Sequence, residues 1–333
     1  MIYENDIDKI IMYDTSIASD NIGDEIIMNS VYREMRTILE PYMILKHSTH
    51  TPIMHLFQLL SKKDPAFNYY SDAKYKFIGG SNIFKKTLRV RRADWNVNAF
   101  DALFYKEAIT IGCGSSFGTS FQTDRYTRNL YKNILNSKYY HSVRDDKTKC
   151  FIESLGLKAI NTGCVTMWSL TEEHCNSIPD IKGNNAIFTL TGYKPDKIND
   201  KKMIDIILDN YDKVYFWPQS IGDMGYLRSL KVLEKDIIVV NPNLCAYEKL
   251  LDRGNIDYIG TRLHGGICAL QHKCRSIIVS IDNRAEDMNS KNNLRCIKRE
   301  NIEHELPFRI NEKMPTSIVV DFELVQKWKE QFL

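Results

Sequence analysis

The stretch Tyr258–His272, YIGTRLHGGICALQH, contains the end of a predicted buried strand, a polar turn and the start of a predicted helix. The strand ends at Gly260, Arg262 and His264 lie in the turn, and two glycines precede the apolar helical run. The first N–H groups of a helix lack intrahelical partners and can bind an anion. Arg262 adds a planar donor fork, and His264 adds the side-chain type whose unperturbed pKa lies nearest neutrality. The stretch therefore predicts an anion site with a proton-transfer group, or alternatively a surface arginine beside a helix-capping histidine.

Length and composition indicate a globular chain of two domains. The chain has 333 residues, of which 43% are hydrophobic and 26% charged. This length exceeds one typical core and suits two ordinary domains. The net charge of +3 is too small to indicate a nucleic-acid partner. The basic and aromatic run 85–95 is predicted to be a solvated face, with contact to the inner membrane face as the alternative.

Cysteine usage and hydropathy indicate a reducing compartment. The eight cysteines contain no CxxC pair, and several lie in apolar runs typical of buried thiols. The N-terminus lacks a basic segment leading into an apolar run, and no later apolar run approaches the length of a membrane span. We therefore expect a soluble, cytoplasmic protein. HExxH and paired Cys/His spacings are absent, so no zinc site is predicted.

Successive strand-turn-helix units occupy the first half of the chain. Predicted strands at 9–13, 43–46, 77–78, 108–111 and 139–143 run into glycine-rich or polar turns, and a helix is predicted at 52–61. The first turn has one glycine where a dinucleotide fold has GxGxxG, which argues against NAD or FAD. The turns contain these candidate ligand-binding residues: Asn21, Gly23 and Asp24; Gly80, Ser81 and Asn82; Gly112, Gly114, Ser115 and Gly118; and Arg144.

The pattern restarts in the second half. Strands are predicted at 186–190, 213–216, 237–240, 256–259 and 276–279, and the turn after the second of them contains Gln219, Ser220 and Asp223. Ligands of open α/β sheets bind at the carboxyl ends of the strands, where all these turns lie. We therefore predict an α/β protein with two Rossmann-like parallel-sheet domains, 1–178 and 179–315, facing a cleft. A C-terminal helix within 316–333 is expected to return to the first domain.

With these turns in view, the chain resembles the polysaccharide pyruvyl transferase family. The matching segments are NIGDE (21–25), GGSNIF (79–84), IGCGSSFG (111–118), SVRD (142–145), WPQS (217–220) and, most specifically, TRLHG (261–265) with the helix and the strand SIIVSID that follow. The resemblance runs from residue 21 to about 288. It implies a GT-B-like fold and transfer of the three-carbon unit of phosphoenolpyruvate onto a sugar as a ketal. Ser81 departs from the family pattern, which usually reads GGG.

The resemblance also implies residue roles. Phosphoenolpyruvate would be held by Arg144 and Arg262, with Leu263 and Gly265 beside it, because its carboxylate and phosphate require cationic donors. His264 is the expected general acid/base, and Asp24 or Asp223 would take a hydroxyl proton. The remaining turn residues would bind donor or acceptor. This chemistry requires no redox cofactor and no metal. The expected partner is a sugar, lipid-linked or free.

Two other functions remain open. In a nucleotide-sugar glycosyltransferase of the GT-B kind, Arg262 and His264 would hold a diphosphate, and Glu286 or Asp287 would grip a ribose. In a catalytically idle sugar-binding or scaffold protein, an anion clamp beside a proton donor would have no physical purpose. The presence of Arg144, Arg262 and His264 therefore argues for an enzyme.

Overall fold

The computed structural model describes residues 7–53, 58, 70–89, 95, 97–116, 123–232 and 236–333, without the side chains of 283, 284, 286 and 287. The chain divides into two compact units. Unit 1 comprises Met1–Ser19, Ile27–Trp168 and Asp321–Leu333, and unit 2 comprises Asp20–Ile26 and Ser169–Val320. Each unit is an α/β structure around parallel strands. The helix predicted at 52–61 and Gly118 lie largely or wholly outside the described residues.

Unit 1 contains a four-stranded parallel sheet in the order β2-β1-β3-β4. The strands are β1 (Lys9–Asp14), β2 (Met43–Ser48), β3 (Tyr75–Gly79) and β4 (Ala108–Ile111). A parallel pair, β5 (His141–Val143) and β6 (Ala159–Asn161), adjoins β4 through the bridge between Cys113 and Val143. β3 and β4 are buried along their whole length, as expected of parallel strands that are covered on both faces.

The helices of unit 1 begin at polar caps where the sequence provides them. They are α1 (Ile22–Glu34, of which Ile22–Ile26 belong to unit 2), α2 (Arg36–Leu39), α5 (Ala102–Tyr105), α6 (Arg125–Ile134), α7 (Asp146–Ser154), α15 (Phe322–Lys329) and the 3₁₀ turns η1 (Val165–Met167) and η3 (Glu330–Phe332). Asp124 and Asp145 cap α6 and α7 by accepting from backbone N–H groups three residues on. The terminal helix belongs to unit 1, because Trp328 Nε1 donates to Tyr140 O at 2.7 Å and the ring of Phe332 stacks on Tyr139.

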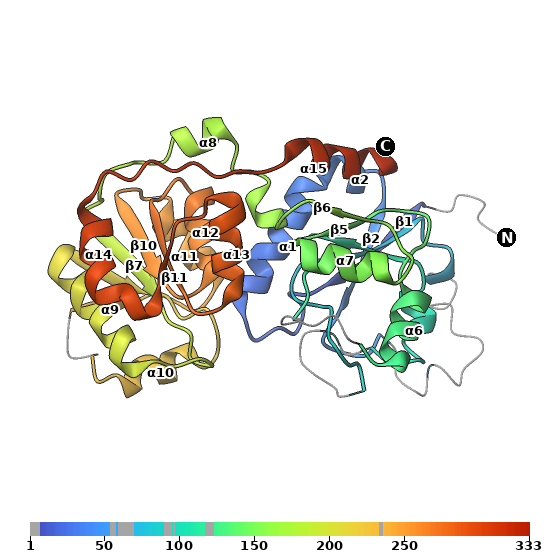
Figure 1. The fold of residues 1–333 in the computed structure, drawn as a ribbon, viewed down its shortest axis with the longest axis horizontal. Coiled ribbons are helices and arrows are strands. Elements are labelled where there is room, and N and C mark those ends of the chain that lie inside the picture. The colour runs from blue at the N-terminus through green and yellow to red at the C-terminus, as the bar shows by residue number, and fades with distance from the viewer. Residues whose placement is uncertain are drawn as a thin grey trace. The chain divides into compact units, whose positions relative to one another are not determined.

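Unit 2 contains a six-stranded parallel sheet in the order β12-β11-β10-β7-β8-β9. The strands are β7 (Asn185–Thr189), β8 (Lys213–Phe216), β9 (Ile237–Val239), β10 (Ile256–Gly260), β11 (Ser276–Ser280) and β12 (Cys296–Lys298). The helices are α8 (Glu172–Asn176), α9 (Lys197–Asn210), α10 (Asp223–Ser229), α11 (Leu244–Leu251), α12 (Leu263–Gln271), α13 (Asn283–Asn292), η2 (Arg299–Asn301) and α14 (Ile302–Asn311). In Figure 1, α9 and α14 cover one side of this sheet, and α12 and α13 cover the other. The unit is therefore doubly wound.

The strand order of unit 2 reverses between β7 and β10. From β7 the chain proceeds outward through β8 to β9, and it then returns to the other side for β10, β11 and β12. At such a reversal the two following loops leave in opposite directions, which opens a crevice at the carboxyl ends of the strands. The turn after β10 contains Arg262. The fold thus places the RLHG sequence at the position where doubly wound sheets bind ligands.

The unit boundary lies near Trp168, and we predicted a boundary after residue 178. Trp168 stays with unit 1, where its indole donates to Thr162 O at 2.9 Å. The short helix α8 stays with unit 2, because His174 Nε2 hydrogen bonds to Leu270 O at 2.8 Å. Residues 20–26, which we placed in the N-terminal domain, pack with unit 2. Among the described helices, none is both long and apolar enough to cross a bilayer.

Candidate functional site

The RLHG turn after β10 is tighter than the sequence suggested. β10 ends at Gly260, Arg262 is the extended N-cap residue, and α12 begins at Leu263. His264 therefore lies in the first helical turn, and Gly265 lies inside the helix where we expected a turn before it. The reason is packing, because a Cβ on Gly265 would come within 2.9 Å of Gln219 Oε1 and 3.2 Å of the Tyr258 hydroxyl. The glycine lets the start of α12 approach the sheet closely.

Arg262 is buried and held at one edge of its guanidinium. Its side chain is 5% exposed and forms a bidentate ion pair with Asp223, in which Nε lies 3.1 Å from Oδ2 and Nη2 contacts Oδ1. Nε also donates to Leu190 O at 3.0 Å, and the group stacks over the ring of Tyr193 at 5.1 Å. Within the described part of the chain, these hydrogen bonds engage Nε and Nη2 but not Nη1. The opposite edge of the fork is thus preorganised for a ligand.

Asp223 has the contacts of a positioning residue. Its carboxylate is fully buried and accepts N–H bonds from Gly192 at 3.0 Å, Gln219 at 3.2 Å and Ser220 at 2.9 Å, besides the pair with Arg262. Both oxygens are occupied by these five N–H donors. A general base needs an oxygen directed at the substrate proton. We therefore revise the sequence-based hypothesis: Asp223 orients Arg262 and the 219–220 turn.

A hydroxyl network fixes the backbone of the RLHG turn. The Tyr258 hydroxyl donates to Arg262 O at 2.6 Å and lies 2.6 Å from Thr189 Oγ1, while Thr191 and Thr261 pair their hydroxyls at 2.8 Å. Burial raises the pKa of Tyr258, so its proton stays available for these bonds. Our sequence reasoning missed these residues. The signal was the position of the TLTGY turn directly after a buried strand, which also brings Tyr193 under Arg262.

Gln219 lies between two close-packed glycines. Its Nε2 donates to Asn21 Oδ1 at 2.9 Å, and the same Asn21 oxygen accepts from Gly23 N at 3.1 Å. Because that oxygen can only accept, the orientation of the glutamine amide is determined. Gln219 Oε1 then faces the start of α12 near Gly265, buried and without a partner in the described part of the chain. The site thus contains one unused buried acceptor. Ser220 bridges the strand-like pairing with Asn21.

These side chains line a small cavity in unit 2. It encloses about 40 Å³ and is lined by Asn21, Tyr193, Gln219, Thr261, Arg262, Leu263, His264, Ile278, Val279, Ile281, Asp282 and Ala285. Pockets that hold a whole drug-sized ligand measure roughly 300–1,000 Å³. The space is therefore the size of one anionic group. His264 is 7% exposed, lies in this lining one residue inside the helix and is well placed to reach such a group.

Asp24 does not belong to the lining of this cavity. It is 8% exposed in the first turn of α1, where its charge favours the positive end of the helix dipole. Its backbone N–H bonds to Asn21 O at 3.0 Å, so it continues the same turn as Asn21 and Gly23. The structure brings Asn21, Gly23, Gln219 and Ser220 together with Arg262. Asp24 is adjacent to this turn in sequence but does not line the cavity.

The predicted site residues of unit 1 form a second cluster. Arg144 follows β5, its side chain is 6% exposed, and it donates to Asn82 Oδ1. Asp145 lies 3.9 Å from Arg144 Nε and also caps α7, so the ion pair is loose. A Cβ on Gly114 would overlap the guanidinium, which explains the glycine. The backbone of Ser81 accepts from Gly114 N at 2.8 Å, which ties the turn that contains Gly80 to this arginine.

Two further residues of the unit 1 cluster are structural. Ser115 Oγ accepts from Thr148 Oγ1 at 3.0 Å, which anchors the glycine turn to α7. The Cys113 thiol is fully buried, and burial raises its pKa to about 12, so it stays protonated and unreactive. Arg144, Asn82 and Gly114 remain the members of this cluster that are suited to a ligand.

Possible metal ligands gather away from both clusters. In the described part of the chain, Glu248 on α11, Cys268 on α12 and His272 directly after α12 bring ligand atoms within 4.8 Å of one another. His272 Nδ1 is 2.6 Å from Asp252 Oδ1, and its Nε2 is 3.8 Å from Glu248. His272 is thus already engaged by two carboxylates, and Cys268 is buried. None of these side chains lines the cavity at Arg262.

Solved structures place the fold in the GT-B class. The UDP-GlcNAc 2-epimerase of Methanocaldococcus jannaschii aligns with a TM-score of 0.50 and 14% identity, over 92% of this chain and 93% of the other. The enzyme of the same name from Neisseria meningitidis aligns with a TM-score of 0.52 and 10% identity, over 98% and 100%. At such identities the likeness concerns the fold. No curated protein matches the chain significantly.

The family follows from the sequence match. The model of the polysaccharide pyruvyl transferase family matches residues 21–283, and the chain belongs to this family. The matched range includes every motif from the first glycine turn to the wall of the cavity at Ile278–Ile281. The protein is thus a transferase that acts in polysaccharide modification. The predicted family resemblance and fold class are confirmed.

Proposed function

We propose that this protein transfers the three-carbon unit of phosphoenolpyruvate to two hydroxyls of a sugar, forming a cyclic ketal and releasing phosphate. The observation that supports the proposal is the buried Arg262, fixed by Asp223 at one edge, beside His264 at the start of α12. The family relation supplies the reaction class. The cavity fits one anionic group, which agrees with a donor that is gripped by one end.

The reaction sets the tasks for these residues. The enol carbon of the donor must gain a proton, and two sugar oxygens must form bonds to the neighbouring carbon while its bond to the phosphate oxygen breaks. Of the two hydroxyl protons, one ends on the new methyl group and the other on phosphate. The protein must therefore hold an anion, move a proton and stabilise a leaving group whose negative charge grows.

Arg262 is suited to hold the donor anion. Asp223 cancels its formal charge, so the attraction for an anion is directional: it comes from the open guanidinium edge and from the first N–H groups of α12. Leu263 and Gly265 would contribute such N–H groups. Rigid attachment at Nε and Nη2 removes the rotamer entropy that a free arginine would lose on binding. In unit 1, Arg144 with Asn82 and Gly114 is a second candidate anion grip.

His264 is our candidate for the proton transfer. It lies two residues from Arg262 and in the same cavity. A cationic neighbour lowers the pKa of a histidine, and a bound phosphate raises it again, so substrate would favour the protonated acid. No metal and no redox cofactor enters this proposal. Asp24 stays a second candidate for accepting a hydroxyl proton.

The decisive test is an acceptor assay. The protein is incubated with phosphoenolpyruvate and a panel of nitrophenyl and lipid-linked sugars, and products are analysed by mass spectrometry together with phosphate release. We expect the mass increase of one pyruvate ketal and one phosphate for each product. Arg262→Ala is the matched negative variant. Phosphate release that leaves every sugar unmodified would count against the transfer.

The same assay addresses the cellular context. We propose that the acceptor belongs to a surface polysaccharide or to its lipid-linked precursor, and that the protein works in the cytoplasm or at the cytoplasmic face of the membrane. Within the run 85–95 that would approach lipid, Trp95 is buried in the core of unit 1 against Tyr105 and Tyr131, so only the basic residues are candidates for lipid contact, and residues 90–94 lie outside the described residues. Activity only with lipid-linked acceptors would support the membrane location, and equal activity with free sugars would oppose it.

A nucleotide-sugar glycosyltransferase is the second candidate. The two epimerase structures hold UDP-GlcNAc, and their folds resemble this one. The acids that would grip a ribose, Glu286 and Asp287, have side chains outside the described residues. Transfer of a sugar from UDP-GlcNAc in the same acceptor panel, with none from phosphoenolpyruvate, would favour this candidate.

A further inference from the structure

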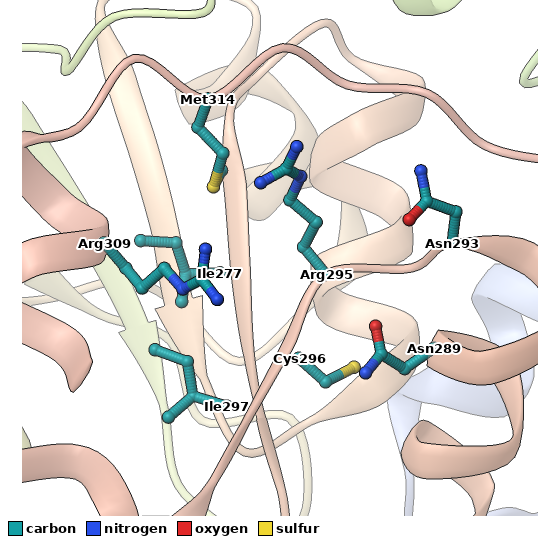
Figure 2. A pocket seen from close by; sticks show the side chains of 8 residues that line it. All are labelled: Ile277, Asn289, Asn293, Arg295, Cys296, Ile297, Arg309 and Met314. Carbon is teal, nitrogen blue, oxygen red and sulfur yellow. The ribbon is translucent and has the colours of Figure 1, made fainter.

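A second cavity in unit 2 lies at the opposite edge of the sheet from Arg262. It encloses about 250 Å³. Ile277 near the start of β11 and Cys296 at the start of β12 contribute to its wall, so it is at the amino ends of these strands. Figure 2 shows that the guanidinium groups of Arg295 and Arg309 enter it from opposite sides, from the segment before β12 and from α14. Two cationic forks therefore converge on one space.

The charge of this cavity is only partly neutralised. Arg309 pairs with Glu312 at 2.7 Å. Arg295 forms no ion pair within the described part of the chain, and its Nε is buried without an acceptor. A buried N–H without a partner is costly, and such groups in native proteins usually contact water or an ion. The nearby ion pair between Arg275 and Asp257, 2.8 Å apart, is internally balanced and provides no spare carboxylate.

The other residues that line this cavity indicate what kind of ligand it could bind. Asn289 and Asn293 add amides to the lining, the Asn289 amide next to Cys296, and Ile277 and Met314 contribute apolar side chains. Asn293 Nδ2 donates to Ser317 O at 2.7 Å, which fixes the segment that follows α14 beside the cavity. The volume lies just below the range of roughly 300–1,000 Å³ that is typical for drug-sized ligands. The ligand should thus be small, anionic and partly apolar.

We propose that this cavity binds a small organic anion through Arg295 and Arg309, by a carboxylate or a phosphate group. The planar fork of arginine suits both groups. The site is separate from the candidate active site. Strand β11 and helix α13 contribute to both, with Ile278 and Ala285 at the active site and Ile277 and Asn289 here.

Binding can be measured without catalysis. Inorganic phosphate and pyruvate, as probes for the two chemical groups, are titrated calorimetrically into the full-length Arg262→Gln protein, in which the candidate active site is impaired. The same titrations are repeated with two double variants, in which Arg262→Gln is combined with either Arg295→Gln or Lys298→Gln. Lys298 is exposed and does not line the cavity, so its variant removes the same charge as a control. We expect the Arg295→Gln change to weaken the better probe about tenfold to a hundredfold, and the Lys298→Gln change to leave it within about twofold.

A second measurement locates the anion in wild-type protein. Cys296 lines the cavity, whereas Cys245 is exposed on α11 outside it. Both thiols are alkylated with neutral iodoacetamide, and the rate of alkylation at each is measured by peptide mass spectrometry. Bound anion should slow the alkylation of Cys296 but not that of Cys245. This result supports the proposal even if Arg295→Gln does not fold. Absence of binding by both probes, equal weakening by Arg295→Gln and Lys298→Gln, or binding that leaves the relative labelling of the two thiols unchanged would overturn it.

Discussion

Replacing Asp223 by asparagine tests the arrangement at the RLHG turn most directly. The substitution keeps the size of the side chain but removes its charge and turns one acceptor into a donor. If the amide oxygen takes the place of Oδ2, it keeps the bonds from Gln219 N and Ser220 N. The new NH₂ group then faces Gly192 N–H and Arg262 Nη2, which are both donors. Two hydrogen bonds are lost, and Arg262 stays buried without a counter-charge.

The expected cost follows from that inventory. Removing one partner of a buried ion pair typically lowers the free energy of unfolding by about 3–5 kcal/mol, because the other charge stays desolvated. Full burial of Asp223 and 5% exposure of Arg262 place this pair in that class. The double variant Asp223→Asn with Arg262→Met removes the isolated charge, so most of the lost stability should return. It should still fail to bind the donor, because the cationic fork is gone.

The assay is urea unfolding combined with hydrogen-exchange mass spectrometry of peptides from β8 to α10, so that stability is measured in unit 2. Asp209→Asn makes the same chemical change on the exposed face of α9 and serves as the matched control. Donor affinity is measured on the same samples by calorimetry. An Asp223→Asn protein as stable as the Asp209→Asn control, with unchanged donor affinity, would refute the reasoning.

Three further outcomes are expected. His264→Asn should keep donor binding but lower turnover by about 10²–10⁴-fold, and a less stable protein with normal turnover in its folded fraction would instead identify a structural cap. His141 is buried, Nδ1 faces Thr110 N–H at 3.3 Å, and Nε2 bonds to Asn136 O at 2.9 Å; burial lowers its pKa to about 4. The unfolded state then binds the proton first, so stability should fall by roughly 3 kcal/mol from pH 7 to pH 4, and urea titrations of His141→Gln should lack this component. Ser81 has a left-handed backbone with φ of 76°, so Ser81→Gly should raise the unfolding free energy by about 0.5–1 kcal/mol, and a lower melting temperature would contradict that.

The strands and turns could be predicted because they depend on local sequence. Continuous apolar runs ending at glycine or at a polar turn occur where β1, β7, β8, β10 and β11 are found, since parallel strands are buried on both faces. Two strands without such an apolar run, β6 and β12, were not predicted. β6 and β12 contain only two adjacent apolar residues each, which gives no apolar run to detect, and they form by pairing with β5 and β11.

The roles of charged residues were less predictable. Arg262 and His264 could be identified because their turn follows a buried strand. Asp223 carried the same signal, but its five donors come from residues up to 39 positions away, so its role as the partner of Arg262 could not be read locally. The same holds for Gln219, whose orientation depends on Asn21, 198 positions away.

The amino-acid sequence by itself determined the α/β class, the family and the presence of an arginine and a histidine in one helix-starting turn, because these depend on the order and spacing of neighbouring residues. Only the tertiary structure decided that residues 20–26 join unit 2, that Arg262 presents one edge and gives the other to Asp223, and that Arg295 and Arg309 share a cavity. Each of these facts is a contact between segments distant along the chain. Which of the possible partners a buried charge meets is set by the packing of the sheet and its helices as a whole.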